Sequence, residues 1–296
     1  MTERLIDISD RPARLRVRYD NLVLEAEGGS QNVPLSEIAA LIVSHPQVSY
    51  THSVLAKLAE AGAVFITCDA RRMPSGMLLP LQAHFIQTER FSRQAAASLP
   101  TRKRLWQQIV RAKVRAQAAV LQEVCGHDAG LLELVSRVRS GDATHIEAQA
   151  SRRYWPTLFP TPGFRRDPDG DGWNVHLNYG YAVLRGIVAR AVCGVGLHPS
   201  LGLHHHNRYN AFCLADDLME PLRPLVDRVV ALRARKDAGP PPLLDAESKR
   251  ELLAALTGRV RIQGESRTLF DVATRMASSL AAVFEGTARK LNLPEM

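Results

Sequence analysis

The sequence lacks the cysteine pairs on which zinc ribbons and dithiol redox sites are built. Its four cysteines are Cys68, Cys125, Cys193 and Cys213, and no two of them form a C-x-x-C pair. It also lacks a long apolar run, both inside the chain and in the opening residues MTERLIDISD. We therefore expect neither a transmembrane segment nor a signal peptide, and a cytoplasmic protein with reduced thiols.

The charge of the chain is unbalanced towards the positive side. With 38 Lys and Arg against 30 Asp and Glu, the formal net charge is +8 at pH 7. An excess of basic side chains attracts polyanions over long range, so nucleic acid is the first partner to consider. Hydrophobic residues make up 46% of the 296 residues, which is enough for one large domain or two smaller ones.

The first part of the chain has the pattern of strands. RLRVRYDNLVLEA alternates apolar and polar residues on both sides of Asp20 and Asn21, which is typical of a hairpin. IAALIVSH and AVFITCD are short runs rich in β-branched residues and predict two more strands. Between these runs, SYTHSVLAKLAEAG predicts one short helix that ends at Gly62.

Helical spacing begins at about residue 83 and continues to the end. The longest stretch predicts a helix over 100–124 with Thr101 as its N-cap. RRMPSGMLLPL, rich in Pro and Gly, is interpreted as the connection before the helices, and GRVRIQGES as a turn near the end. We therefore expect an α+β protein with a small β-rich N-terminal domain, residues 1–80, and a larger all-α domain, residues 81–296.

Histidines and acids are densest in GLHHHNRYNAFCLADDLMEPLRP. His204, His205 and His206 fall in a predicted loop, and the helix after it carries Asp217 and Glu220 on nearly the same face. Consecutive side chains diverge, so we do not expect one metal ion to use all three histidines. A metal site and an ordinary polar surface both remain open for this segment.

Two further features lie upstream of that cluster. Glu147, in HIEAQASRRYW, is followed by Ala148 and Ala150, whose small side chains leave room for a partner to approach. A predicted helix before it is strongly basic, which is typical of a face that contacts phosphates and equally of a solvated surface. Its basic residues are Arg102, Lys103, Arg104, Arg111, Lys113 and Arg115.

These motifs together resemble the CRISPR-associated integrase family, the universal catalytic subunit of spacer acquisition. The run LNYGYAVLRGIVARAVCGVGLHPSLGLHHHNRYNAFCLADDLMEPLRP resembles the family's core. The order G-x-H-H-x-N, N-x-F and D-L-M-E-P is similar to the branch found in single-effector, type II systems. EAQASRRYW is similar to the first acidic motif and KRLWQQIVRAKVRAQ to the basic helix, so the resemblance covers nearly the whole chain in order.

The resemblance implies a catalytic, metal-binding triad. Its members fall on Glu147 in the first motif, His205 as the second histidine of G-L-H-H, and Glu220 in D-L-M-E-P. Asp217 matches a further acid without an assigned role, and His206 falls at a variable position that is not a ligand. The implied cofactor is Mg²⁺ or Mn²⁺, for which the carboxylates supply hard oxygen ligands.

The resemblance also implies the reaction. A 3′-hydroxyl of captured spacer DNA attacks a phosphodiester of the repeat array, and a divalent cation sharpens the nucleophile and stabilises the leaving oxygen. This transesterification needs no ATP, in agreement with the absence of a G-x-x-x-x-G-K-[ST] loop. With water in place of the hydroxyl, the same site would act as a DNA endonuclease.

The implied partners follow from the same resemblance. Family members form homodimers through their β-rich domains, and two dimers flank a dimer of a small ferredoxin-like subunit. Spacer precursor and repeat array are the implied DNA partners, the effector nuclease of the same system is a further protein partner, and no membrane is involved.

Two other classes of function stay open at this point. One is a non-catalytic DNA-binding scaffold, against which the intact triad argues. The other is a zinc hydrolase that uses the histidines of 204–206, against which their adjacency and the absence of an H-E-x-x-H motif argue. The metal content of the purified protein would separate both from the integrase.

Overall fold

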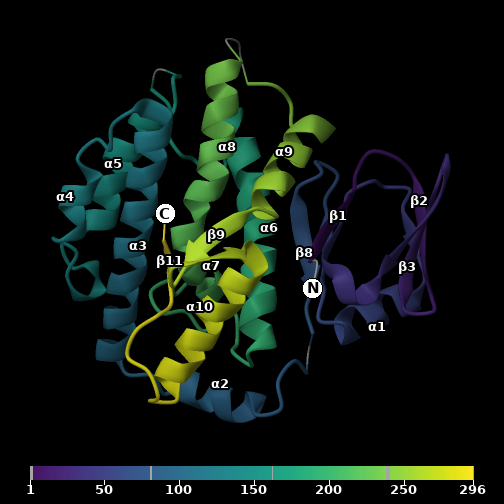
Figure 1. Cartoon of the computed structure of the whole chain (residues 1–296), viewed down its shortest axis with the longest axis horizontal. Coiled ribbons are helices and arrows are strands. Elements are labelled where there is room, and N and C mark those ends of the chain that lie inside the picture. The colour runs from purple at the N-terminus through teal and green to yellow at the C-terminus, as the bar shows by residue number, and fades with distance from the viewer. Residues whose placement is uncertain (1–2, 81, 162, 238–240, 296) are drawn as a thin grey trace.

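The computed structural model describes residues 3–80, 82–161, 163–237 and 241–295. Strands gather at the N-terminal end of the molecule and helices make up most of the rest (Figure 1), which confirms the predicted α+β class. Within the described ranges, no helix is both long enough and apolar enough to cross a membrane.

Two four-stranded sheets form the N-terminal part, with strand orders β1-β5-β7-β8 and β4-β3-β2-β6. Strands β1, β5 and β7 run parallel, and β8 pairs antiparallel with β7 at the edge. The strands are β1 (Arg4–Ile8), β2 (Ala13–Arg18), β3 (Asn21–Ala26), β4 (Gly29–Pro34), β5 (Ile38–Val43), β6 (Ser49–Tyr50), β7 (Val64–Cys68) and β8 (Pro74–Leu78), with helix α1 (His52–Glu60) between β6 and β7.

The predicted hairpin is the β2–β3 pair. Arg18 pairs with Asn21, which leaves Tyr19 and Asp20 as a two-residue turn, and both have positive φ angles of 47° and 55°. Positive φ at both central residues matches the right-handed twist of the flanking strands. The predicted helix that ends before Gly62 is α1, and Gly62 has the left-handed φ of +71° expected of such a stop.

The sheet that contains β5 is buried on both faces. Leu41 of β5 belongs to a small hydrophobic cluster within the N-terminal part, whereas its neighbours Ala40 and Ile42 belong to the large cluster built from the helices. Helix α6 approaches closely because Gly186 has no side chain: a Cβ there would lie 2.8 Å from Cδ1 of Ile66 on β7. One face of the sheet therefore belongs to the core of the helical part, and the other face to a smaller core within the N-terminal part.

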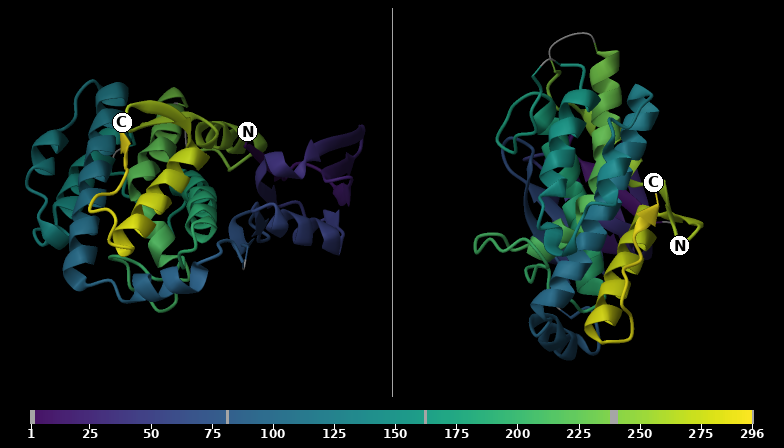
Figure 2. Two further views of the ribbon diagram at one scale, coloured as in Figure 1. Left: turned by 60° about the horizontal axis from the view of Figure 1, so that its bottom comes forward. Right: turned by 90° about the vertical axis from the view of Figure 1, so that its left-hand side faces the viewer.

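The helical part is organised around two long helices, α3 and α6, with the others packed along them (Figures 1 and 2). The helices are α2 (Gln87–Ala95), α3 (Leu99–Cys125), α4 (Leu131–Val135), α5 (Ile146–Leu158), α6 (Trp173–Gly194), α7 (Cys213–Met219), α8 (Arg223–Lys236), α9 (Ala246–Leu256) and α10 (Leu269–Phe284). A short 3₁₀ turn, Glu220–Leu222, joins α7 to α8 where Pro221 and Pro224 interrupt the predicted helix.

Three local predictions were wrong. RRMPSGMLLPL is not only a connection, because β8 lies within it and pairs with β7, and Pro74 is tolerated at the start of an edge strand. GRVRIQGES is a hairpin of β9 (Arg259–Ile262) and β10 (Glu265–Thr268), and β9 also pairs with β11 (Pro294–Glu295). The N-cap of α3 is Ser98, whose side chain accepts from the Thr101 backbone amide, because Pro100 fits the first turn.

Candidate active site

Glu147 is held at the start of α5 by an aspartate that caps this helix. The Asp142 carboxylate accepts from the backbone amides of Ile146, at 2.9 Å, and Glu147, at 3.0 Å. These amides are among the first N–H groups of the helix, which have no partner within it. The cap therefore fixes the backbone at Glu147 and directs this residue towards α3.

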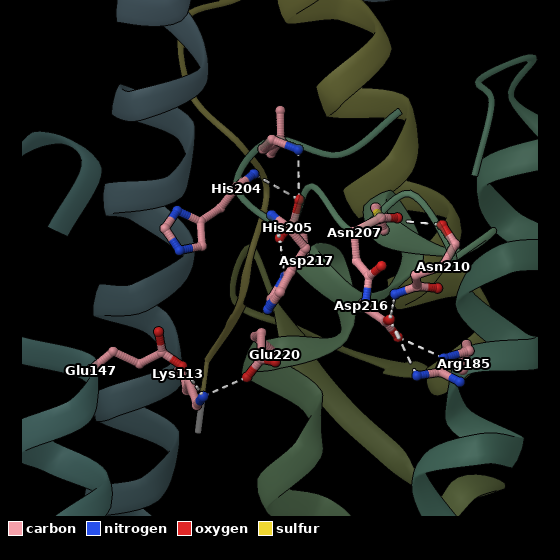
Figure 3. Close-up of polar contacts among 12 residues, drawn as sticks. Lys113, Glu147, Arg185, His204, His205, Asn207, Asn210, Asp216, Asp217 and Glu220 are labelled. Carbon is pink, nitrogen blue, oxygen red and sulfur yellow. Dashed lines mark hydrogen bonds and ion pairs between the residues drawn. The ribbon is translucent and has the colours of Figure 1, made fainter. Parts of the chain in front are cut away.

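The Glu147 and Glu220 carboxylates meet at one cation, the ammonium of Lys113 on α3 (Figure 3). Lys113 Nζ lies 2.6 Å from Glu147 Oε1 and 2.5 Å from Glu220 Oε2. The two acids are far apart in the chain and come from α5 and from the turn between α7 and α8. The fold therefore brings together two of the three residues predicted to form the triad, with a lysine between them.

Glu220 is a buried, ionised acid. Burial alone would raise its pKa, but Arg223, whose Nε lies 3.0 Å from Glu220 Oε1, and Lys113 outweigh burial and lower the pKa to about 2. The carboxylate thus carries its charge across the neutral pH range. A buried carboxylate kept anionic by adjacent cations is suited to binding a cation.

Asp217 organises the loop that carries the histidines. Its side chain is 0% exposed and accepts from the backbone amides of Leu203, at 2.6 Å, His204, at 3.0 Å, and His205, at 3.2 Å. The same carboxylate lies 2.6 Å from Nδ1 of the His205 ring, and this hydrogen bond raises the pKa of His205 (Figure 3). With Nδ1 engaged, Nε2 is the ring atom left for a ligand or substrate.

The three adjacent histidines have different surroundings. The His204 ring stacks on Trp106 of α3 at a centroid distance of 4.3 Å, and burial lowers its pKa. It stands at 83° to the ring of His205, with centroids 5.6 Å apart, and His206 is exposed. The rings do not converge on one point, which argues against a zinc site built from all three.

Close packing and a second acid fasten the loop to α6 and α7. A Cβ at Gly202 would lie 2.4 Å from the His205 carbonyl oxygen of the same loop and 2.9 Å from Cβ of Cys213 on α7, so a larger residue would push the loop away from α7. Asp216, next to Asp217, pairs with Arg185 of α6 at 2.6 Å and accepts from Asn210 Nδ2 at 2.7 Å. The asparagine of the N-x-F motif is therefore part of the loop anchor.

The residues present fit a divalent cation in charge and chemistry. Two carboxylates already share one cationic partner, and His205 lies close enough to Glu220 to lower the pKa of that acid. In the described part of the chain, no three His, Cys, Asp or Glu side chains stand together as a ready metal-binding group. A metal ion at this place would be held by Glu147, Glu220 and the free nitrogen of His205.

The basic helix α3 exposes only some of its basic side chains to solvent. Lys103, Arg104 and Arg115 are exposed, whereas Arg102 and Arg111 are half-buried, and Arg111 donates to the Val138 carbonyl at 3.0 Å. Lys113, predicted to contact DNA on the same face, is 9% exposed and points to the two acids. Its predicted place on a solvated DNA-binding face was wrong, because burial on a long helix cannot be inferred from charge alone.

The amino-acid sequence is similar to those of known proteins. The family model described as "CRISPR associated protein Cas1" matches residues 6–240. The chain is 37% identical over 287 residues to a CRISPR-associated endonuclease Cas1 from Neisseria meningitidis, and the match covers 96% of this chain and 93% of that protein.

Two solved structures have a similar fold at low sequence identity. A casposase bound to its integration product matches with a TM-score of 0.77 and 20% identity, over 99% of this chain and 93% of that one. A Cas1 protein from Thermotoga maritima matches with a TM-score of 0.74 and 16% identity, over 97% of each chain. These likenesses concern the arrangement of elements over nearly the full length.

Proposed function

The chain belongs to the Cas1 family of CRISPR-associated proteins, and from this premise we propose that it is a divalent-metal-dependent DNA integrase and endonuclease. It would insert captured spacer DNA into a repeat array by attack of a 3′-hydroxyl on a phosphodiester. The relative from Neisseria is named an endonuclease, and the similar casposase is bound to an integration product. The first name supports DNA cleavage and the second supports DNA strand transfer.

One observation carries the proposal. Glu147 and Glu220, from separate motifs, converge on a single cation, and His205 lies near Glu220 on a loop fixed by Asp217. A Mg²⁺ or Mn²⁺ ion bound there would supply a Lewis acid for the attacking and leaving oxygens. Glu147 and Glu220 would hold it by oxygen, and His205 by Nε2.

The remaining residues would prepare this centre for DNA. Asp217 holds the His205 ring in one orientation, which avoids an entropic cost when ligand binds. The exposed part of α3, with Lys103, Arg104 and Arg115, would contact phosphates without reading the base sequence. The histidine cluster is less suited to a zinc hydrolase, because the rings of His204 and His205 diverge.

The proposed partners are spacer and repeat DNA, a second copy of the chain, and a small ferredoxin-like subunit. Similar structures include a complex in which a Cas1 segment is assembled with Cas2, at a TM-score of 0.77 and 17% identity. That likeness supports a protein partner of the Cas2 kind. The effector nuclease of the same system is proposed as a further partner.

An integration assay tests the function. Purified protein, with and without the partner subunit, is mixed with a short duplex with free 3′-hydroxyls and a supercoiled target that carries repeats. We expect covalent joining in Mg²⁺ or Mn²⁺ and none after chelation with EDTA. Joining that is unaffected by EDTA would remove the metal from the proposal, and failure with every target and partner would leave the scaffold alternative.

DNA binding is expected to depend on salt through α3. Replacing Arg104 and Arg115 by Ala should flatten the slope of log affinity against log salt by about 0.9 for each lost phosphate contact to duplex DNA. Arg250→Ala, on the exposed side of α9, is the matched control and should leave the slope unchanged. An unchanged slope in the α3 double variant would show that this face does not contact DNA.

Dimer formation is expected to use the N-terminal sheets. The β4 edge is solvent-exposed over most of its length, and Arg14, Arg16 and Arg18 point outward from β2, so this part offers an unpaired edge and a charged face. Light scattering at micromolar concentration should give twice the mass of one chain. A monomeric mass at that concentration would contradict the prediction.

A further inference from the structure

The position of Lys113 has a consequence for metal binding. Its ammonium touches both acids that the proposed function assigns to the metal ion, and its side chain is almost completely buried. A divalent cation between the same carboxylates would lie in contact with this ammonium. Like charges at that distance and in that degree of burial repel strongly, so the ion and the ammonium exclude each other.

We infer that Lys113 is a resident counter-ion: it neutralises Glu147 and Glu220 in the metal-free protein, and a divalent cation binds by displacing it. This inference rests on the proposed metal site. Without a counter-ion, Glu220 would be an anion of 4% exposure with Arg223 as its remaining cationic contact. Lys113 thus stabilises the fold before metal arrives, at the expense of metal affinity.

The structure contains a second place for the displaced ammonium. A cavity of about 170 Å³ adjoins Glu220. Its polar lining includes Lys113, Gln117, Glu220 and Asp227, together with the cations Arg166 and Arg223. Gln117 lies one helical turn after Lys113 on the same face of α3, is 2% exposed, and its Oε1 has no hydrogen-bond partner. A buried amide oxygen without a donor is costly, and an ammonium in the cavity would supply one.

Asp227 adds a further oxygen acceptor at this second position, and burial raises its pKa to about 7. Its carboxylate accepts from the hydroxyl groups of Tyr154, at 3.0 Å, and Tyr181, and it also lines the cavity. An ammonium that leaves the acid pair would therefore move towards an amide oxygen and a carboxyl group within the protein. Lys113 would exchange one set of acceptors for another, which offsets part of the cost of its displacement and of its repulsion by Arg166 and Arg223.

The test is a titration of Mn²⁺ into metal-free protein, followed by calorimetry and by thermal melting, with no DNA present. Lys113→Met keeps the length of the side chain and removes the charge. We expect a lower Tm than wild type without metal, Mn²⁺ affinity increased by about tenfold or more, and a larger rise of Tm on adding Mn²⁺. Lys57→Met, which removes an exposed lysine paired with Glu60, is the matched control and should bind Mn²⁺ as wild type does.

A second variant tests the displaced position. Gln117→Leu removes the acceptor in the cavity, so we expect weaker Mn²⁺ binding with metal-free stability equal to or above wild type. If Lys113→Met does not fold, two other results test the displacement of Lys113. They are Mn²⁺ binding by Gln117→Leu and the position of Lys113 Nζ in crystals of the wild-type protein with Mn²⁺. Nζ that stays between the carboxylates while Mn²⁺ is bound would overturn the inference.

The outcomes separate this inference from the proposed function. Equal or weaker Mn²⁺ binding by Lys113→Met, while Glu147→Gln and Glu220→Gln both lose binding, would overturn the displacement and leave the metal site in place. Mn²⁺ binding that is unchanged in Glu147→Gln and Glu220→Gln would show that the ion lies elsewhere, and both proposals would fall.

Discussion

Glu147→Gln, His205→Ala and Glu220→Gln are each expected to reduce integration by about a thousandfold or more, because a metal ion that stabilises the reacting oxygens contributes several kcal/mol to lowering the barrier. DNA affinity should change little, since it comes mainly from the basic surface. The measurement is the rate of covalent joining in Mg²⁺ or Mn²⁺, with circular dichroism to verify the fold and salt titrations to compare affinity.

His206→Ala is the control for the histidine. Its side chain is exposed and lies next to His205 in the loop, so its loss should leave integration unchanged. Full activity in His205→Ala together with loss in His206→Ala would show that the triad uses the other histidine. Metal-dependent joining that survives in both acid variants would remove the triad as a whole.

Asp217→Ala is expected to cause the largest loss of stability among single substitutions at the site. Three backbone amides lose their acceptor at a fully buried position, and each unsatisfied group costs about 1–3 kcal/mol. Partial relaxation of the loop should bring the total to about 3–5 kcal/mol of unfolding free energy. Urea denaturation measures it, with the exposed Asp169→Ala as the control that should stay near wild type.

Asp217→Asn separates the loop from the chemistry. The amide keeps one oxygen for the backbone donors, so less stability should be lost than in Asp217→Ala. The partner of His205 Nδ1 becomes a neutral amide in place of a carboxylate. Integration should therefore fall by about ten- to a hundredfold, as for other partners that orient a metal-binding histidine. Equal activity in Asp217→Asn and wild type would show that Asp217 supports the loop alone.

The order of the long elements could be predicted from sequence because each carries its own signal. The β2–β3 hairpin has a turn between alternating strands, and α3 and α6 have long helical periods. Strand β8 and the β9–β10 hairpin could not be predicted, since such short strands are stabilised by the neighbours to which they pair. Those neighbours are known only after folding.

The candidate site could likewise be predicted only in part from the sequence. Its acids and its histidine stand in motifs, so the sequence predicts them as metal ligands. The position of Lys113 between Glu147 and Glu220 depends on how α3 packs against α5 and the turn after α7, over separations that no local pattern reports. Asp217 was found in a motif but without a role, because its donors are backbone amides, which every residue except proline has.

The core shared by the strands and α6 sets a length scale for the proposed dimer. Ile66 of β7 packs against Gly186 of α6, and the adjacent Arg185 forms an ion pair with Asp216. Asp217, the next residue, forms a hydrogen bond with the ring of His205. From the sheet to the histidine there is thus an unbroken series of packed contacts, although the chain itself passes through the connection after β8. In the proposed dimer, two copies joined through their sheets would therefore hold their two candidate sites at a constant separation.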